Sequence, residues 1–254
     1  MAYVPQPPSG SRQWLPDACL SFQPSGIQAF ANVSALRASP QSVTRVSEVA
    51  TRFFADHGRL DFLWFLGPRS TPVGVVDLLL ALGATTLGDC TAMVLDHEPP
   101  AVPAVDIRQV TTPDQLLTYR RIGAATEVAD EATSDQETQL AASNAAAWHD
   151  YTSYNGRRLN FVAYLDGEPS SAAGLLLTDH GVGVLSGAAT LPAARGRGLY
   201  TALVHTRWTT AQRLKAGPLA AQASSMSAPV LAQAGFTRVG DMILLRQQTD
   251  WQTE

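Results

Sequence analysis

The chain has 254 residues, of which 45% are hydrophobic and 16% charged, with a formal net charge of −4 at pH 7. This composition excludes a disordered chain, and the acidic balance argues against a nucleic-acid-binding protein, which normally carries a basic face. Two cysteines, Cys19 and Cys90, cannot make a disulfide framework, and no Cys/His spacing predicts a metal site. No apolar run reaches the about 18 residues of a membrane span. Residues 1–11 lack the pattern of a signal peptide, so we expect a cytoplasmic protein without a membrane partner.

A proline-rich segment divides the chain into a shorter and a longer part. Residues 97–105 read His-Glu-Pro-Pro-Ala-Val-Pro-Ala-Val. Prolines remove backbone donors and favour extended conformations, as a linker requires. We therefore predict one domain over residues 1–104 and a second over residues 105–254.

The first part shows a short alternation of strand and helix patterns. We expect a strand within residues 29–38, a helix over 42–56 with apolar residues at helical spacing, a strand over 62–66, a helix over 73–82 and a last strand containing 93–95.

The second part predicts a mixed sheet. Its elements are a strand over 106–110, helices over 113–148 with a break near 130–134, strands over 160–165, 172–177 and 182–190, a helix over 199–214, a strand over 219–222, a helix ending before Gly235, and two strands over 236–245. This order describes an α/β domain with helices on both faces of the sheet.

The two parts share a short sequence that suggests an internal repeat. Residues 83–89 read Gly-Ala-Thr-Thr-Leu-Gly-Asp and residues 235–241 read Gly-Phe-Thr-Arg-Val-Gly-Asp. Each segment follows an apolar helix and precedes an apolar strand that contains a methionine. We infer that both halves descend from one unit.

The segment richest in chemical information is residues 187–203, where an apolar strand runs through Pro192 into a turn of glycines and arginines and then into a helix. Free amides at a helix start, together with the helix dipole, create a site for an anion. Gly196 and Gly198 lack a Cβ, so the backbone can approach a phosphate closely. Arg195 and Arg197 add positive charge at the same point.

Two common phosphate loops are excluded. A Walker A loop needs a lysine, and the only lysine is Lys215. The dinucleotide fingerprint needs a third glycine where this chain has Thr201. A turn without function is the simpler alternative, but it requires the proline, the glycines, the arginines and the following helix to coincide.

The remaining pattern, Arg-x-x-Gly-x-(Gly/Ala), resembles the acetyl-CoA loop of the GNAT superfamily of N-acetyltransferases, over residues 107–245, and we expect a bacterial member. The resemblance implies a mixed, mostly antiparallel sheet, acetyl-CoA as co-substrate and no metal. Tyr200 departs from the family, which usually has Gly or Ala there. The cofactor-binding residues that the resemblance implies are Ala188, Ala189 and Thr190 along the pantetheine arm and Arg195, Gly196, Arg197, Gly198, Leu199 and Tyr200 around the pyrophosphate.

The first part resembles a smaller, degenerate GNAT-like half of the kind that precedes the active half in some bacterial members. Residues 39–42, Ser-Pro-Gln-Ser, stand where the active half has its loop. We favour a scaffold role for this half. The alternative is that it forms a wall of the acceptor pocket with Trp64 or Arg69.

The catalytic residues are less well marked than the loop. Many relatives have a tyrosine acid four residues before the position of Gly235, where this chain has Leu231. Ser224 matches the position of a frequent asparagine. An alkyl amine titrates near 10 and must lose a proton before it attacks, so a nearby base would assist. Glu127, on the segment that borders the acceptor site in relatives, is the first candidate base, and Ser224 is the second catalytic candidate. Other possible bases stay open: Asp130, Glu131, His149, Tyr151 and His180.

The expected activity is acetyl transfer from acetyl-CoA to a primary amine of a small molecule by direct attack. Two alternatives stay open, a non-catalytic CoA-binding or regulatory module and a protein or peptide acetyltransferase. For a chain of this size we expect a monomer or a homodimer.

Overall fold

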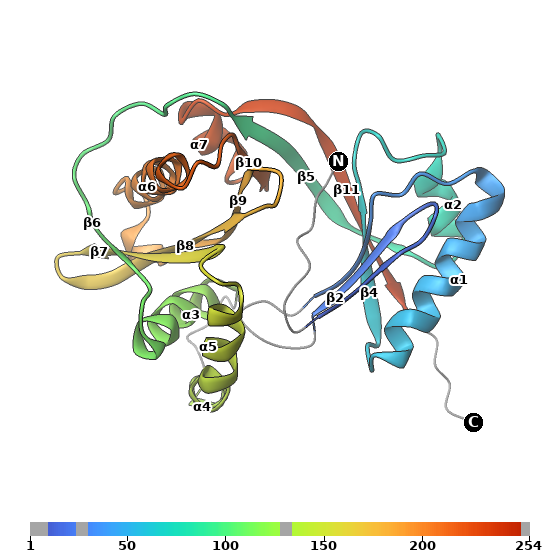
Figure 1. Ribbon diagram of the computed structural model, residues 1–254, viewed down its shortest axis with the longest axis horizontal. Coiled ribbons are helices and arrows are strands. Elements are labelled where there is room, and N and C mark those ends of the chain that lie inside the picture. Colours follow the sequence, from blue (N-terminus) through green and yellow to red (C-terminus); the bar gives the residue numbers. More distant parts are fainter. Residues whose placement is uncertain (1–9, 24–29, 128–133, 250–254) are drawn as a thin grey trace. The chain divides into compact units, whose positions relative to one another are not determined.

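A computed structural model describes residues 10–23, 30–127 and 134–249. The chain packs as two compact units (Figure 1). Unit 1 comprises Met1–Ala92 together with Gly240–Glu254, and unit 2 comprises Met93–Val239. The division falls inside two long strands, β5 (Thr85–Leu95) and β11 (Thr237–Gln248). Within the described residues, no helix is both long and apolar enough to cross a membrane.

Unit 1 is a sheet with two helices. Its strands follow the order β1-β2-β3-β4-β11-β5. The parallel pair β3–β4 is joined by α1, whereas β1–β2, β2–β3 and β4–β11 are antiparallel. The elements not yet bounded are β1 (Ser11–Trp14), β2 (Cys19–Gln23), β3 (Phe30–Ser34), α1 (Pro40–Asp56), β4 (Asp61–Leu66) and α2 (Val75–Ala81).

The core of unit 1 forms because α1 buries one apolar stripe. Val43, Val46, Ala50 and Phe54 recur at helical spacing and are buried. The fully buried Trp64 belongs to the same cluster. Trp64 is therefore a core residue of unit 1.

Unit 2 has helices on both faces of its sheet (Figure 1), with α6 and α7 on one face and α3 and α5 on the other. The end of β5 is followed in order by β10, β9, β8, β7 and β6. The elements are β6 (Asp106–Gln109), α3 (Pro113–Glu127), α4 (Ser134–Ala142), α5 (Asn144–Ser153), β7 (Arg158–Leu165), β8 (Glu168–Leu177), β9 (Gly183–Thr190), the short 3₁₀ helix η1 (Pro192–Ala194), α6 (Leu199–Arg213), β10 (Leu219–Ala223) and α7 (Ala228–Gln233).

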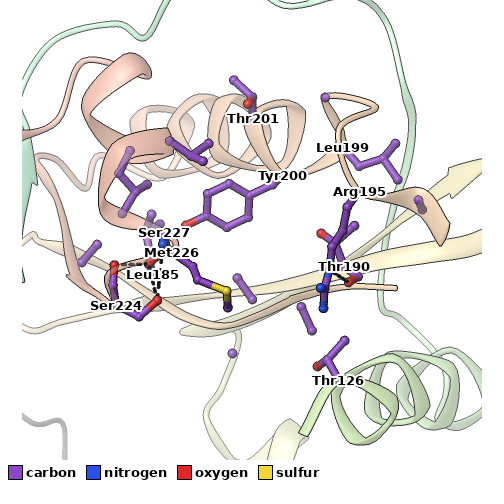
Figure 2. A pocket seen from close by; sticks show the side chains of 18 of the residues that line it. Thr126, Leu185, Thr190, Arg195, Leu199, Tyr200, Thr201, Ser224, Met226 and Ser227 are labelled. Atoms are coloured by element: carbon purple, nitrogen blue, oxygen red, sulfur yellow. Dashed lines mark hydrogen bonds between the residues drawn. The ribbon is translucent and has the colours of Figure 1, made fainter. Parts of the chain in front are cut away.

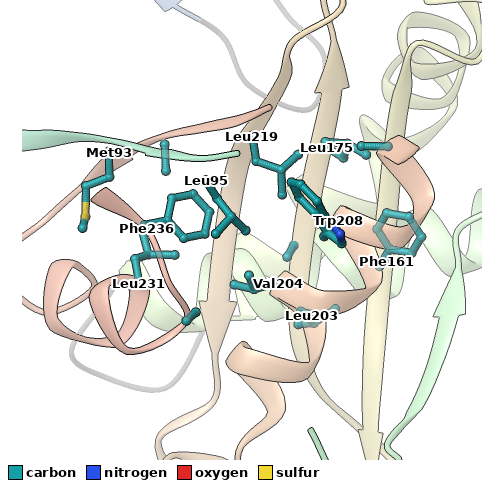
Figure 3. Packing of buried hydrophobic residues seen from close by; sticks show 14 of the residues in the cluster. Met93, Leu95, Phe161, Leu175, Leu203, Val204, Trp208, Leu219, Leu231 and Phe236 are labelled. Carbon is teal, nitrogen blue, oxygen red and sulfur yellow. The ribbon is translucent and has the colours of Figure 1, made fainter. Parts of the chain in front are cut away.

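The core of unit 2 lies between the sheet and α6 (Figure 3). Leu203, Val204 and Trp208 of α6 pack with Leu175 of β8 and Leu219 of β10. Burial of each large aliphatic side chain contributes about 1.5–3 kcal/mol, so this contact fixes α6 and the turn before it.

The inferred repeat appears as a shared geometry. Gly83 follows α2 and Gly235 follows α7, and both glycines adopt a left-handed backbone with φ of 89° and 95°. Each next amide returns to the helix, from Ala84 N to Leu79 O and from Phe236 N to Leu231 O, both at 3.0 Å. Left-handed glycines of this kind end helices because no Cβ clashes there.

The structure corrects several sequence expectations. Residues 236–245 were predicted as two strands, but residues 237–245 lie in the single strand β11, and neither β1 nor β2 was predicted. The expected helix break near 130–134 falls largely outside the described residues. The boundary between residues 104 and 105 stays a prediction about the two halves of the sequence. The compact units divide elsewhere, because unit 2 includes the end of β5 from Met93 and unit 1 includes the end of β11 from Gly240.

Candidate functional site

A pocket of about 770 Å³ lies in unit 2 (Figure 2). It is lined by the second half of β9, the turn that leads into α6, the first turn of α6, and the segment from β10 to α7. All nine residues that the sequence assigned to cofactor binding line this pocket: Ala188, Ala189, Thr190, Arg195, Gly196, Arg197, Gly198, Leu199 and Tyr200. The structure therefore brings together residues that the sequence placed in one loop and one strand.

One wall of the pocket is an open strand edge. The parallel strand β10 pairs with β9 only through Leu219 with Gly183 and Ala220 with Val184. Among the described residues, no pairing between β9 and β10 extends past Val184, whereas β8 pairs with β9 as far as Thr190. An unpaired strand edge presents N–H and C=O groups that can bind an extended ligand.

The start of α6 forms a second wall, with exposed and unpaired amides. Residues 195–198, here called the α6 loop, are exposed, and Gly196 and Gly198 are left-handed with φ of 74° and 76°. Within the described chain, the amides of Gly196, Gly198, Leu199, Tyr200 and Thr201 donate no hydrogen bond of normal geometry to a protein oxygen. These amides and the helix dipole favour an anion.

The matching helix of unit 1 shows the opposite arrangement. At the start of α1, the Ser39 side chain accepts a hydrogen bond from the amide of Ser42 at 3.2 Å. With this serine cap, the amide already donates a hydrogen bond to a protein oxygen and is not free to bind an anion. Gly198, at the start of α6, has no side chain to do so. The two helix starts therefore differ in the feature that binds a phosphate.

Arginines supply the charge of the pocket. Arg195 donates from Nε to the carbonyl of Thr190 at 3.3 Å, which holds its side chain beside the end of β9. Arg197 is exposed in the α6 loop, and Arg207 of α6 contributes to the lining from a fully buried position. Clustered cations next to free amides favour a phosphate-bearing ligand.

Arg207 is a site residue that sequence reasoning missed. Its Nε donates to Leu203 O at 3.0 Å and its Nη1 to Gly174 O at 3.2 Å, while Nη2 has no partner of normal geometry among the described residues. The guanidinium lies 5.9 Å from the centre of the Tyr200 ring. Burial lowers the pKa of Arg207 and raises the pKa of Tyr200, so the phenol holds its proton at neutral pH. The one available signal was an arginine on the apolar face of α6.

A tyrosine from the opposite face of the sheet supports β9. The Tyr119 hydroxyl of α3 donates to Gly187 O at 3.3 Å. Gly187 is left-handed with φ of 54°, and a Cβ there would lie 2.6 Å from the same hydroxyl. Burial raises the pKa of Tyr119, so it remains a neutral donor. A glycine is required here because strand and helix approach so closely.

Of the two catalytic candidates, the structure describes the side chain of Ser224 but not that of Glu127. Ser224 lines the pocket and is exposed, and its hydroxyl lies 3.2 Å from that of Ser227 and accepts from the Ser227 amide at 3.3 Å. Glu127 ends α3, but its side chain lies outside the described part of the chain, although its neighbour Thr126 lines the pocket. Both catalytic assignments stay predictions.

Comparisons with known proteins agree with this geometry. Residues 125–221, which include β9, the α6 loop and α6, match the family model of the acetyltransferase (GNAT) family. A GCN5-related N-acetyltransferase from Kribbella flavida superposes with a TM-score of 0.68 at 14% identity, over 94% of this chain and 90% of that chain. A tandem GNAT protein from the clavulanic acid biosynthesis pathway superposes with a TM-score of 0.60 at 17% identity, over 93% and 79%. No curated protein sequence matches the chain.

These likenesses identify the class of protein. The chain has the fold of GCN5-related N-acetyltransferases over nearly its whole length, with one mostly antiparallel mixed sheet and packed helices. Residues 125–221 match the model of the acetyltransferase (GNAT) family, which supports an enzyme of the acyltransferase class. The family and fold class predicted from the sequence are confirmed.

Proposed function

We propose that this protein binds acetyl-CoA in the pocket of unit 2 and transfers the acetyl group to a primary amine of a small molecule. The observation that carries the proposal is the set of unpaired amides at the start of α6, which face a pocket lined by Arg195 and Arg197. A diphosphate fits this site because it supplies the acceptors and the negative charge that the amides, the dipole and the arginines lack.

The open edge of β9 supports the rest of the cofactor. The pantetheine arm of CoA contains amide groups, which pair with an exposed strand edge as a further strand would. Ala188, Ala189 and Thr190 lie on the part of β9 that β10 leaves unpaired. In this arrangement the arm runs from the α6 loop back along β9, and the thioester reaches the middle of the pocket.

Direct attack is the mechanism that fits the lining. The amine nitrogen forms a bond to the thioester carbonyl carbon and releases a proton to the solvent. The carbon–sulfur bond breaks, and its electron pair leaves with the sulfur of CoA, which takes up a proton. Among the described lining residues there is no cysteine to form an acyl-enzyme, and both cysteines of the chain belong to unit 1. A single displacement therefore accounts for transfer without a covalent intermediate.

Two experiments test this function. Calorimetry with acetyl-CoA should show binding, and the absence of binding would refute the proposal. The alternative is a non-catalytic CoA-binding or regulatory module, which is motivated by Leu231 at the position of the usual tyrosine. Release of the CoA thiol with a broad panel of amines would demonstrate catalysis and reject this alternative. Turnover only with peptides would instead support a protein or peptide acetyltransferase.

We also infer roles for the rest of the chain. Unit 1 serves as a degenerate, scaffold-like half, because Ser39 caps the helix start that would otherwise hold a phosphate. We expect a cytoplasmic monomer or homodimer without a metal, which size-exclusion chromatography and metal analysis of the purified protein would test.

A further inference from the structure

The pocket of unit 2 has one end that strand pairing closes. Among the described residues, the pairing of β10 with β9 goes no further than Ala220 with Val184. Leu185 and Ser186 follow directly on β9, and both line the pocket. Figure 2 shows Leu185 on the opposite side of the pocket from Arg195 of the α6 loop. The pocket therefore runs along β9 from the α6 loop to a closed end at Leu185 and Ser186.

A buried cation lies at this closed end. The side chain of Arg207 belongs to the lining, and its Nη1 donates to Gly174 O at 3.2 Å. Gly174 of β8 is the register partner of Ser186, so this bond holds the guanidinium level with Ser186 along the sheet. Ser186 precedes Thr190 by four residues, which span about 13 Å of strand. Arg207 is thus well separated from the end of β9 that leads into the α6 loop.

No acid neutralises the charge of Arg207. The residue is fully buried, and among the described residues no carboxylate lies within ion-pair distance of its guanidinium. The titratable groups that act on it are the phenols of Tyr119 and Tyr200, and burial raises the pKa of both, so both are neutral at pH 7. A buried cation without a counter-ion is strongly destabilising, so this end of the pocket favours a ligand that brings an anion.

The contacts of Arg207 with the protein do not require an arginine. Its Nε donates to Leu203 O and its Nη1 to Gly174 O, whereas Nη2 has no partner of normal geometry among the described residues. A glutamine amide also has two donors but carries no charge. The features that only an arginine adds are the positive charge and the further N–H donors on Nη2. Both match a carboxylate, which accepts strong hydrogen bonds from a guanidinium.

The path proposed for CoA indicates which part of the ligand meets this cation. The diphosphate lies at the α6 loop, and the pantetheine arm follows Ala188, Ala189 and Thr190. The acyl group at the tip of the arm therefore points to the closed end, beyond the thioester. An acetyl group offers only a methyl group there and leaves the charge of Arg207 unpaired. An acyl chain that ends in a carboxylate is ionised at neutral pH and supplies the missing anion.

We propose that the pocket also accepts CoA thioesters whose acyl chain ends in a carboxylate, of the malonyl or succinyl type, that it binds them more tightly than acetyl-CoA, and that Arg207 binds this carboxylate. Transfer follows the displacement given above: the amine nitrogen bonds to the thioester carbon and loses a proton, and the sulfur leaves with the electron pair and takes up a proton. The carboxylate forms and breaks no bond. The inference rests on the proposed function, because it assumes that CoA occupies this pocket.

The test compares CoA thioesters that differ only in the acyl group, so it needs no knowledge of the acceptor. Malonyl-CoA and succinyl-CoA carry the carboxylate. Isovaleryl-CoA and 4-methylpentanoyl-CoA are their neutral counterparts, in which two methyl groups replace the two carboxylate oxygens. In calorimetric titrations of the wild-type protein, we expect malonyl-CoA or succinyl-CoA to bind about tenfold to a hundredfold more tightly than its neutral counterpart and than acetyl-CoA, as for a hydrogen bond to a charged group.

Three variants assign this preference to one side chain. R207Q keeps donors for the two backbone carbonyls and removes the charge, so the affinity ratio of charged to neutral thioester should fall to about one. R213Q is the matched control, because Arg213 is an exposed residue of the same helix outside the lining, and it should keep the wild-type ratio. R197Q removes a charge of the α6 loop, so it should weaken all four thioesters alike and also keep the ratio.

The outcomes separate this inference from the proposed function. If neither acetyl-CoA nor the other thioesters bind, both fall together. If acetyl-CoA binds but the charged thioesters bind no more tightly than their neutral counterparts, the inference is overturned and the proposed function stands. A preference that a folded R207Q retains would overturn the role of Arg207. If R207Q does not fold, R197Q decides: a ratio that it keeps supports the inference, and a ratio that it abolishes overturns it.

Discussion

The substitution Gly198→Glu tests the α6 loop most directly. Gly198 is exposed, and a Cβ added there meets nothing within 4 Å, so the new side chain has room. It would carry a negative charge to the helix start, where we place the diphosphate. At about 4 Å, one pair of unit charges repels by about 1 kcal/mol in bulk water and about 4 kcal/mol near a protein surface. We therefore expect acetyl-CoA to bind about fivefold to several hundredfold more weakly.

Backbone strain has to be separated from charge in this experiment. Gly198 has φ of 76°, a conformation that costs a residue with a Cβ about 1–2 kcal/mol. Gly198→Ala carries the strain without the charge. Gly167→Glu carries both the strain, with φ of 87°, and the charge, at an exposed turn outside the pocket. Both controls should lower thermal stability while binding acetyl-CoA much more tightly than Gly198→Glu does.

The assay is calorimetric titration of acetyl-CoA at two salt concentrations. Because salt screens exposed charges, the difference between wild type and Gly198→Glu should shrink as ionic strength rises. Equal affinity of wild type and Gly198→Glu at low salt would contradict the placement of the diphosphate at this helix start. Equal losses in Gly198→Glu and Gly198→Ala would instead show that strain, and not charge, is responsible.

Two further predictions concern stability in each unit. Gly187→Ala should lower the free energy of unfolding by about 1–3 kcal/mol, because its Cβ would lie 2.6 Å from the Tyr119 hydroxyl, and an unchanged melting temperature would contradict this close contact. Gln247→Leu should cost about 1–3 kcal/mol in urea unfolding, since the buried Trp64 Nε1, which now donates to Gln247 Oε1 at 2.8 Å, would lose its acceptor. The exposed Gln248→Leu is the control and should change little.

Local sequence patterns were sufficient for the elements of unit 2 that carry the site. The strand over 182–190 and the helix over 199–214 appear as β9 (Gly183–Thr190) and α6 (Leu199–Arg213). The glycines of the α6 loop predicted a tightly curved backbone, and in the structure Gly196 and Gly198 have left-handed conformations. The strands were harder to predict from the sequence than the helices. The short strands β1 and β2 were missed, and β11 is one continuous strand where two were expected.

The sequence by itself was enough to predict a phosphate site at residues 195–200, because that prediction depends on neighbouring amides and on glycines that are close in the chain. Only the tertiary structure revealed the open edge of β9, since pairing with β10 depends on contacts about 36 residues apart in sequence. The same holds for the burial of Arg207 beside Tyr200, which follows from the packing of α6 on β8. The burial of Arg207 and the separation of β9 from β10 both depend on tertiary packing. Together with the α6 loop, they form the lining of the pocket.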